Sequence, residues 1–253
     1  MIATLRSLWV WTAVAVLIVV WLPLLALIRL ADRDPVRYTT GRWFRRLGVA
    51  MTSANPSWKV HLDGEPVSDP RRPYVVVSNH QSLADIPIIS HLPWEMKWIG
   101  KAELFSLPVI GWMMRLAGDI PVDRADRRSG ARMLLIARRY LQQKCSVMFF
   151  PEGTRSPDGR VGAFNQGAFH LAIKAGVPVL PVVVEGSSNC LPKKSWKFGP
   201  PLHIRLRVLP PVETQGMTTD DSAKLRDDVR SMIVRQIAAW RETDERRVDA
   251  LAG

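Results

Sequence analysis

Residues 74–85 of the chain read Tyr-Val-Val-Val-Ser-Asn-His-Gln-Ser-Leu-Ala-Asp. The first four follow Pro73 and form an apolar run rich in β-branched side chains, which is typical of a buried strand. The polar residues that come next include His80 and Asp85. Because functional groups of open α/β sheets gather beyond the carboxyl ends of strands, the stretch predicts a strand followed by a functional loop.

The same alternation continues along the chain. Further strands are predicted at residues 146–150, 179–184 and 203–208. Helical composition occurs at residues 129–143, 166–175 and 220–240. Pro178 and Pro181 place the third strand at an edge or a terminus of the sheet, because proline cannot donate to a central ladder. The sequence therefore predicts an α/β fold, a single mixed-sheet α/β domain over residues 55–253.

The N-terminal region has a different composition. No charged residue occurs over residues 7–28, and about 20 apolar residues suffice to cross a hydrocarbon core about 30 Å thick. A cleaved signal peptide is the alternative, but the apolar run exceeds the roughly 7–15 residues usual there, and Arg29 and Arg33 follow at once. We expect a retained membrane anchor.

Arginines dominate the segment that follows the anchor. Residues 1–54 hold seven Lys+Arg against two Asp+Glu, a net charge of +5, which favours the cytoplasmic side of a membrane. Pro35 can begin a second helix, and residues 36–51 mix arginines with apolar side chains, as a helix lying in the headgroup layer does. A packed helix with solvated arginines is the alternative. We predict that residues 1–54 form a membrane anchor and interfacial helix.

Composition excludes several classes of protein. The chain has 253 residues, 47% of them hydrophobic, and a formal charge of +12, which excludes disorder and a disulfide scaffold. Cys145 and Cys190 form no Cys-x-x-Cys pair, and no histidines stand at ligand spacing from them, so we expect no metal site. Nucleic-acid binding lacks any recognisable motif here. A non-enzymatic protein that binds anionic lipid stays an alternative.

His80 and Asp85 together can act as a general base and the carboxylate that orients it. Five positions in a regular helix would turn the two side chains apart by about 140°. We therefore expect the pair to span a loop and a helix N-terminus. A helix-capping turn without catalytic function is the alternative.

A second polar loop follows the predicted strand at residues 146–150. It reads Pro-Glu-Gly-Thr-Arg-Ser-Pro-Asp-Gly-Arg over residues 151–160, and Gly, Thr and Arg can aim backbone N–H groups and a guanidinium at an anion. Glu152 would repel a phosphate, so we expect it to contact a substrate hydroxyl or to orient the arginines. A surface loop with a salt bridge is the alternative.

Four motifs in order resemble those of the glycerolipid acyltransferase family, most closely its members that acylate 1-acyl-sn-glycerol 3-phosphate. They are Asn79-His80-Gln81-Ser82 with Asp85, Gly118 to Arg124, Phe150-Pro151-Glu152-Gly153-Thr154-Arg155-Ser156, and Val177-Pro178-Val179-Leu180-Pro181-Val182. The resemblance covers roughly residues 55–215. Asn165 stands where family members often have lysine, so no charge is available at that position.

The resemblance implies a role for each matching residue. His80 is similar to the general base that deprotonates the acceptor hydroxyl, and Asp85 to the residue that orients it. The substrate-binding residues implied are Arg124 and Arg155 on the acceptor's phosphate, Lys101 as a further phosphate ligand, and Glu152, Gly153 and Thr154 around that pocket.

The implied reaction transfers an acyl chain from acyl-CoA or acyl-carrier protein to the sn-2 hydroxyl of 1-acyl-sn-glycerol 3-phosphate, giving phosphatidic acid. It needs the thioester as co-substrate and no cofactor. The implied location is the inner membrane, with the catalytic domain facing the cytoplasm and the lipid acceptor in the bilayer. Two alternatives stay open: another lysolipid acceptor, such as a lyso-ornithine lipid, and a membrane thioesterase.

Overall fold

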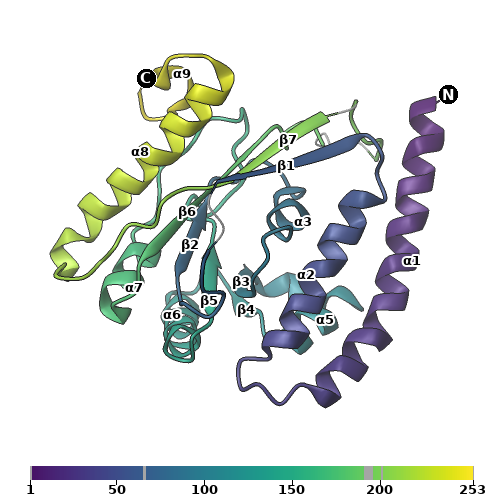
Figure 1. The fold of residues 1–253 in the computed structure, drawn as a ribbon, viewed down its shortest axis with the longest axis horizontal. Helices are drawn as coiled ribbons and strands as arrows, with labels where there is room; N and C mark the ends of the chain where they lie inside the picture. The colour runs from purple at the N-terminus through teal and green to yellow at the C-terminus, as the bar shows by residue number, and fades with distance from the viewer. Residues whose placement is uncertain (1, 65–66, 191–195, 201, 253) are drawn as a thin grey trace. The chain divides into compact units, whose positions relative to one another are not determined.

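The computed structural model describes residues 2–64, 67–190, 196–200 and 202–252 (Figure 1). The chain folds into two compact units. The first unit comprises Met1–Pro56, Ser68–Pro73 and Ile86–Met148, and the second comprises Ser57–Val67, Tyr74–Asp85 and Phe149–Gly253. This division follows packing, and the predicted boundary between a membrane-binding part and an α/β part at residue 54 stays a prediction.

The first unit carries three parallel strands in the order β5-β3-β4. They are β3 (Met96–Lys101), β4 (Ile120–Val122) and β5 (Ser146–Phe149). Its helices are α1 (Ile2–Ala31), α2 (Tyr38–Ser53), α4 (Ala102–Ser106), α5 (Ile110–Ala117) and α6 (Arg127–Gln142), with most of α3 (Asp85–Ile89). Asp126 begins α6 by accepting a hydrogen bond from the backbone N–H of Arg128, which satisfies one of the free donors of the first turn.

Helices α1 and α2 form an antiparallel pair. Trp9 near the start of α1 donates its indole N–H to the carbonyl of Ala54, and Trp21 donates to the carbonyl of Trp43 in α2, at 3.2 and 2.8 Å. Leu25 and Leu47 pack together with Met113 of α5. Among the described residues, one helix, over residues 4–31, is long and apolar enough to cross a membrane. Much of its apolar surface is exposed: Leu5, Leu8, Trp9, Trp11, Val16, Val19, Val20, Leu27 and Leu30.

The three arginines of α2 have different surroundings. Arg45 is buried and pairs with Asp119, which precedes β4. Arg42 donates to the carbonyls of Leu92 and Trp94 at 2.8 and 3.2 Å. Arg46 alone of these three is exposed. Arg42 and Arg45 therefore attach α2 to the rest of the first unit.

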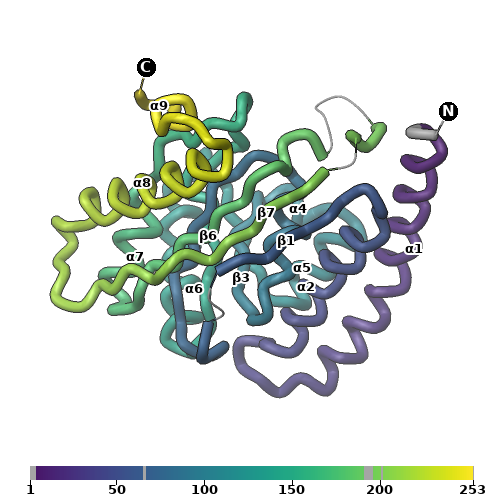
Figure 2. The backbone as a smooth tube through the Cα atoms, turned by 45° about the horizontal axis from the view of Figure 1, so that its top comes forward, coloured from purple at the N-terminus to yellow at the C-terminus, as the bar shows by residue number. Residues whose placement is uncertain are grey.

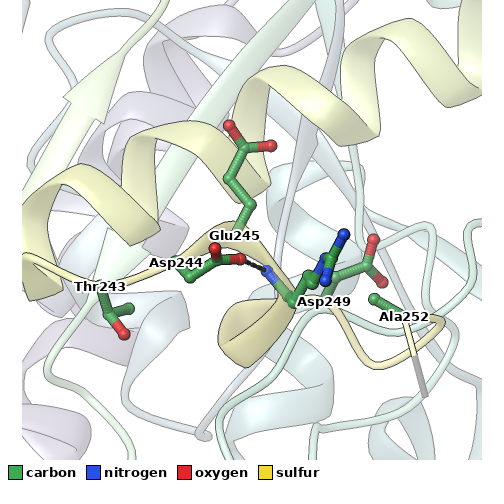
Figure 3. A pocket seen from close by; sticks show the side chains of 6 residues that line it. Thr243, Asp244, Glu245, Asp249 and Ala252 are labelled. Carbon is green, nitrogen blue, oxygen red and sulfur yellow. Dashed lines mark hydrogen bonds between the residues drawn. The ribbon is translucent and has the colours of Figure 1, made fainter.

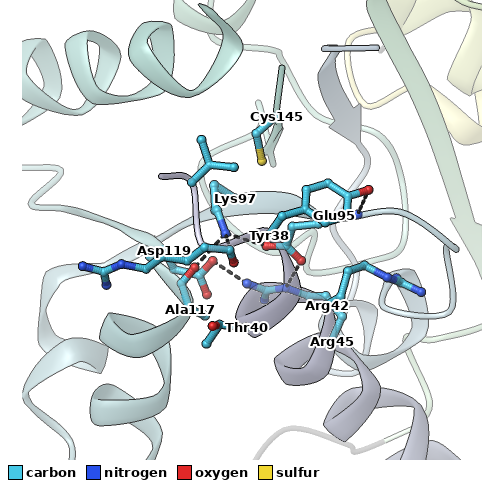
Figure 4. A network of polar contacts seen from close by, with 12 residues as sticks. Tyr38, Thr40, Arg42, Arg45, Glu95, Lys97, Ala117, Asp119 and Cys145 are labelled. Carbon is cyan, nitrogen blue, oxygen red and sulfur yellow. Dashed lines mark hydrogen bonds and ion pairs between the residues drawn. The ribbon is translucent and has the colours of Figure 1, made fainter. Parts of the chain in front are cut away.

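At the N-terminal ends of β3 and β4 lies a buried charged cluster, defined as Arg45, Glu95, Lys97 and Asp119 (Figure 4). Lys97 donates to Glu95 Oε1 at 2.9 Å and to the carbonyls of Ala117 and Arg37 at 2.7 and 3.2 Å. Arg45 Nε lies 3.7 Å from Glu95 Oε2. Two positive and two negative charges balance there, as burial of ions requires.

The described part of the second unit carries four strands in the order β1-β7-β6-β2, of which β1, β7 and β6 are labelled in Figure 2. They are β1 (Trp58–Gly64), β2 (Val75–Ser78), β6 (Val179–Glu185) and β7 (Leu202–Val208). The unit's helices are α7 (Gly167–Ala175), η1 (Thr219–Asp221), α8 (Ser222–Arg241) and α9 (Glu245–Val248). Strand β7 pairs parallel with β1 and antiparallel with β6, and β2 pairs parallel with β6. The predicted mixed α/β fold is confirmed.

The expectation of an edge position for the strand with two prolines is wrong. Strand β6 lies between β7 and β2. Its antiparallel ladder with β7 begins at Val182, and the carbonyl of Pro181 accepts from the N–H of Leu209 at 2.9 Å. Pro181 therefore stands where the ladder starts, and only the return bond to Leu209 is lost, so the central strand tolerates it.

Candidate active site

His80 and Asp85 meet in the structure as a hydrogen-bonded pair. His80 lies in the loop after β2, and Asp85 is the first residue of α3, as their spacing predicts. His80 Nδ1 lies 2.8 Å from Asp85 Oδ2. The same oxygen accepts from the backbone N–H groups of Gln81 and Ser82 at 2.7 and 2.9 Å. Asp85 thus binds the backbone of the loop that precedes α3 and also fixes the imidazole.

The pairing decides which ring nitrogen is free to act. An ionised carboxylate only accepts hydrogen bonds, so Nδ1 carries the proton and Nε2 of the neutral ring keeps a lone pair. The Asp85 side chain is fully buried, whereas 11% of the His80 side chain is exposed. Asp85 Oδ1 is buried and accepts no hydrogen bond from the described residues. A proton arriving on His80 would be stabilised by this poorly solvated carboxylate.

The backbone and ring of His80 are held from several sides. Its N–H donates to Glu152 Oε1 at 2.7 Å, and its carbonyl accepts from the N–H of Ser156 at 2.7 Å. The imidazole stacks on Phe150, with ring centroids 4.0 Å apart and planes 17° apart. Asn79 exchanges two hydrogen bonds with the backbone of Val184, at 2.8 and 3.0 Å. These contacts leave the imidazole little freedom to turn.

Glu152 connects the two polar loops within the second unit. Oε1 accepts from His80, and Oε2 accepts from the N–H of Gly162 at 3.0 Å. Burial raises the pKa of the Glu152 carboxyl, and the two backbone hydrogen bonds oppose that rise. The predicted contact of Glu152 with a substrate hydroxyl stays a prediction. Both of its carboxylate oxygens already accept a hydrogen bond from a backbone N–H group.

The turn at residues 153–155 begins with a glycine in the left-handed backbone conformation. Gly153 has φ 71°, and a side chain there would meet Asn165, whose amide donates to the carbonyl of Pro151 at 2.8 Å. Thr154 and Arg155 are exposed. Within the described ranges, neither their backbone N–H groups nor the Arg155 guanidinium has a hydrogen-bond partner. The turn can therefore offer several donors to an anion.

Lys101 and Arg124 belong to the first unit. Lys101 ends β3 opposite Val122, the last residue of β4, and Arg124 follows two positions after β4. Lys101 lies 3.6 Å from Glu103, and both side chains are largely exposed. The two cations thus follow the carboxyl ends of neighbouring parallel strands, and their phosphate-binding roles stay predictions.

Sequence reasoning missed a group of polar residues next to the His80 loop. Gln81 donates its amide to Glu185 Oε2 at 2.9 Å, and Glu185 is paired with Arg241 of α8. Arg230, also on α8, binds the carbonyls of residues 161 and 162. The sequence feature that could have pointed to Arg230 and Arg241 is their spacing, because two residues eleven positions apart fall on one face of a helix.

The described residues contain no group of three or more His, Cys, Asp or Glu side chains able to hold a metal ion. A surface hollow at the C-terminal end is lined by Thr243, Asp244, Glu245, Arg246, Asp249 and Ala252 (Figure 3). None of the predicted site residues lines it.

We predict that neither cysteine reacts with thiol reagents in the folded protein. Both are buried, and burial raises the pKa of Cys145 and of Cys190 to about 12. At pH 8 the thiolate fraction is therefore negligible. Titration with Ellman's reagent should detect no thiol before denaturation and two thiols after it. Rapid modification of one thiol in the folded state, with loss of acyl transfer, would instead point to a cysteine nucleophile.

Comparison with known proteins gives consistent matches. A model of the Acyltransferase family matches residues 59–185. The chain is 39% identical over 163 residues, 64% of its length, to the chloroplastic 1-acyl-sn-glycerol-3-phosphate acyltransferase LPAT1 of Arabidopsis thaliana. It is 41% identical over 176 residues, 68% of its length, to 1-acyl-sn-glycerol-3-phosphate acyltransferase alpha of Mus musculus. The matched segments span 46% and 61% of these two relatives, less than two thirds of either.

A solved structure is similar over nearly the whole chain. The crystal structure of the 1-acyl-sn-glycerophosphate (LPA) acyltransferase PlsC from Thermotoga maritima superimposes with a TM-score of 0.77 and 29% sequence identity, covering 94% of this chain and 95% of that one. The matched family segment contains His80, Asp85 and the loop at residues 151–160. Because that segment makes up half of the sequence, the chain belongs to the acyltransferase family.

Proposed function

We propose that the protein transfers an acyl chain from a thioester to the sn-2 hydroxyl of 1-acyl-sn-glycerol 3-phosphate, forming phosphatidic acid. The observation that carries the proposal is the His80–Asp85 pair, with Nδ1 held 2.8 Å from a buried carboxylate and Nε2 left as the base. Family membership and the printed activities of the similar proteins support the choice of reaction.

The proposed step needs no covalent acyl-enzyme. His80 Nε2 takes the proton of the lipid hydroxyl as its oxygen attacks the thioester carbonyl, and Asp85 stabilises the resulting imidazolium. The tetrahedral intermediate then expels the thiolate, which takes the proton back from His80. A thiol with a pKa of about 8.5 is a good leaving group, so no second acid is required. The co-substrate is acyl-CoA or acyl-carrier protein, without a resident cofactor.

The turn at residues 153–155 is proposed to bind the acceptor's phosphate. Two backbone N–H groups and the Arg155 guanidinium lie in one short segment, next to the residue that holds the backbone of His80. Such a set of donors suits a phosphate, because backbone N–H groups and a guanidinium are its usual ligands. Lys101 and Arg124 are proposed as further phosphate ligands.

The lipid acceptor sets the proposed location. Helix α1 exposes a long apolar surface, and the first 54 residues carry a net charge of +5. Each basic residue close to an anionic bilayer adds roughly 1 kcal/mol of attraction. We propose that the protein is bound to the inner membrane with its catalytic residues on the cytoplasmic side, where a thioester donor is available.

A product assay tests the proposal directly. Purified full-length protein is incubated with a labelled acyl thioester and either 1-acylglycerol 3-phosphate, its dephosphorylated form or a lyso-ornithine lipid. We expect labelled phosphatidic acid from the phosphorylated acceptor only. Free fatty acid without acceptor would identify a thioesterase, and efficient use of another lysolipid would correct the acceptor. Running acyl-CoA and acyl-carrier protein in parallel identifies the donor.

Replacing Arg155 with alanine should raise the KM for 1-acylglycerol 3-phosphate by about 10- to 100-fold. One charge-assisted hydrogen bond to a phosphate contributes on the order of 1.5–3 kcal/mol, and kcat should change less because binding rather than proton transfer is affected. Arg160 is the matched control, since it is also exposed on this loop but already pairs with Asp158 at 2.7 Å. An unchanged KM in Arg155→Ala would exclude the phosphate contact.

A further inference from the structure

Helix α8 carries two arginines on its buried face. Arg230 and Arg241 are eleven residues apart, about three full turns at 3.6 residues per turn. The same face carries the buried residues Val234, Ile237 and Ala238. A charged side chain among apolar ones is costly unless it is fully partnered. The partners of both guanidiniums are therefore informative.

Arg230 fixes the segment that follows the second polar loop. Its Nε donates to the carbonyl of Gly162 at 2.7 Å, and Nη2 donates to the carbonyl of Val161 at 2.6 Å. Asp249 accepts from both terminal nitrogens, at 3.0 and 2.5 Å. Asp249 also lines the hollow in Figure 3, so this carboxylate already has its cation.

The contact at Gly162 leads directly to His80. The N–H of Gly162 donates to Glu152 Oε2, and Glu152 Oε1 accepts from the N–H of His80. A side chain on Gly162 would meet Glu152 Oε2 at 3.2 Å, so the approach is already close. Arg230 is thus linked to the backbone of His80 by three successive hydrogen bonds, through Gly162 and Glu152.

Arg241 binds the second polar loop itself, at Gly159. It binds Glu185 with two parallel hydrogen bonds, at 2.9 and 2.8 Å, and its Nη2 also donates to the carbonyl of Gly159 at 2.9 Å. Glu185 Oε2 accepts from the Gln81 amide, and the N–H of Gln81 donates to Asp85 Oδ2. Arg241 is therefore linked to the carboxylate that orients the imidazole.

We propose that Arg230 and Arg241 are positioning residues, which hold the His80–Asp85 pair in its reactive geometry from a helix outside the matched segment 59–185. Neither guanidinium contacts His80 or Asp85. Both act through residues that do: Arg230 through Glu152, and Arg241 through Gln81. As a statement about catalysis the proposal rests on the proposed function, whereas the geometry that it assigns to His80 can be tested without any substrate.

The kinetic test compares full-length Arg230→Gln, Arg241→Gln and Arg241→Lys with Arg235→Gln. Arg235 is the matched control, because it lies on the same helix and is exposed. Arg230→Gln and Arg241→Gln should lower kcat by about 10- to 100-fold, since a misplacement near 1 Å costs that much, with both KM values within about twofold. Arg241→Lys should recover only part of the rate, because an ammonium cannot form the two parallel bonds to Glu185.

The second readout is the Nδ1 proton of His80, observed by NMR in protein labelled with ¹⁵N-histidine and assigned by its absence in His80→Ala. With five histidines in the chain the spectrum is simple. A proton held against a buried carboxylate gives a downfield signal that exchanges slowly. We expect this signal to broaden or disappear in Arg230→Gln and Arg241→Gln, to persist at least in part in Arg241→Lys, and to stay unchanged in Arg235→Gln.

The two readouts separate failure of this proposal from failure of the proposed function. An unchanged Nδ1 signal with an unchanged kcat would overturn the positioning roles. An unchanged signal with a reduced kcat and a lower melting temperature would also overturn them, since the arginines would then only stabilise the fold. Loss of the signal in a protein that acylates no lysolipid would support the geometry and reject the acyltransferase function.

Discussion

Replacing His80 with alanine should lower kcat by about 10²- to 10⁴-fold, the usual contribution of a positioned general base. The KM for the lipid acceptor should stay within about twofold, because the donors proposed for its phosphate lie on residues 153–155 and not on the imidazole. The effect is large because the two carboxylates beside His80 are not placed to replace it as the base. Glu152 uses both oxygens on backbone N–H groups, and Asp85 is fully buried.

The measurement is acyl transfer under saturating donor and acceptor, with folding checked by circular dichroism and melting temperature. His61→Ala is the control, since His61 is an exposed histidine of the same unit. Removing the ring also leaves Asp85 without its partner, so His80→Gln is measured too, because its amide can still donate to the carboxylate but cannot take a proton. Turnover near the wild-type rate in folded His80→Gln would remove His80 as the base.

The fold was predictable where sequence and burial agree. Strands β2, β5 and β6 were expected within one or two residues, because buried strands appear as continuous apolar runs, and β7 was expected from its alternation of apolar and polar residues. Strand β1 was missed because its residues are half-buried or exposed and include lysine, histidine and aspartate. Strand β3 was missed because Lys97 interrupts its apolar pattern, and that lysine is buried only through partners from distant segments.

The candidate site was predictable where it is local. The His80–Asp85 contact follows from a spacing of five and the helix-capping residues around it. The double use of Glu152, by contrast, depends on Gly162, which lies ten residues further on. The helical period places Arg230 and Arg241 on one face of α8, but the groups that they bind depend on how α8 packs against segments distant in sequence. Three-dimensional contacts between segments distant in sequence were the missing information.

Replacing Lys97 with methionine should lower the free energy of unfolding by about 3–5 kcal/mol, because it leaves Glu95 as an uncompensated charge in the buried charged cluster. Both side chains are fully buried, and Figure 4 shows them within the cluster. For a protein of this size the loss corresponds to a fall of roughly 6–20 °C in melting temperature. Scanning fluorimetry of the full-length protein measures it, with the exposed Lys174→Met as control.

The double variant Lys97→Met/Glu95→Gln should recover most of this loss, since Arg45 and Asp119 still balance each other. Acid pH should also reduce the stability deficit of Lys97→Met, that is, the difference in unfolding free energy between wild type and this variant. Burial raises the pKa of Glu95, so with Lys97 gone this carboxyl is a group whose folded pKa exceeds its unfolded value. Such a group favours the folded state below its unfolded pKa and loses that contribution as pH rises through the folded pKa.

The deficit should therefore be smaller at pH 5 than at pH 8. The cluster lies at the N-terminal ends of the strands that lead to Lys101 and Arg124, so a repaired double variant also separates stability from catalysis. If the double variant is as stable as wild type and its KM for the phosphorylated acceptor is unchanged, the cluster supports folding alone. If Lys97→Met is as stable as wild type at pH 8, Lys97 is not needed to balance the charge of Glu95.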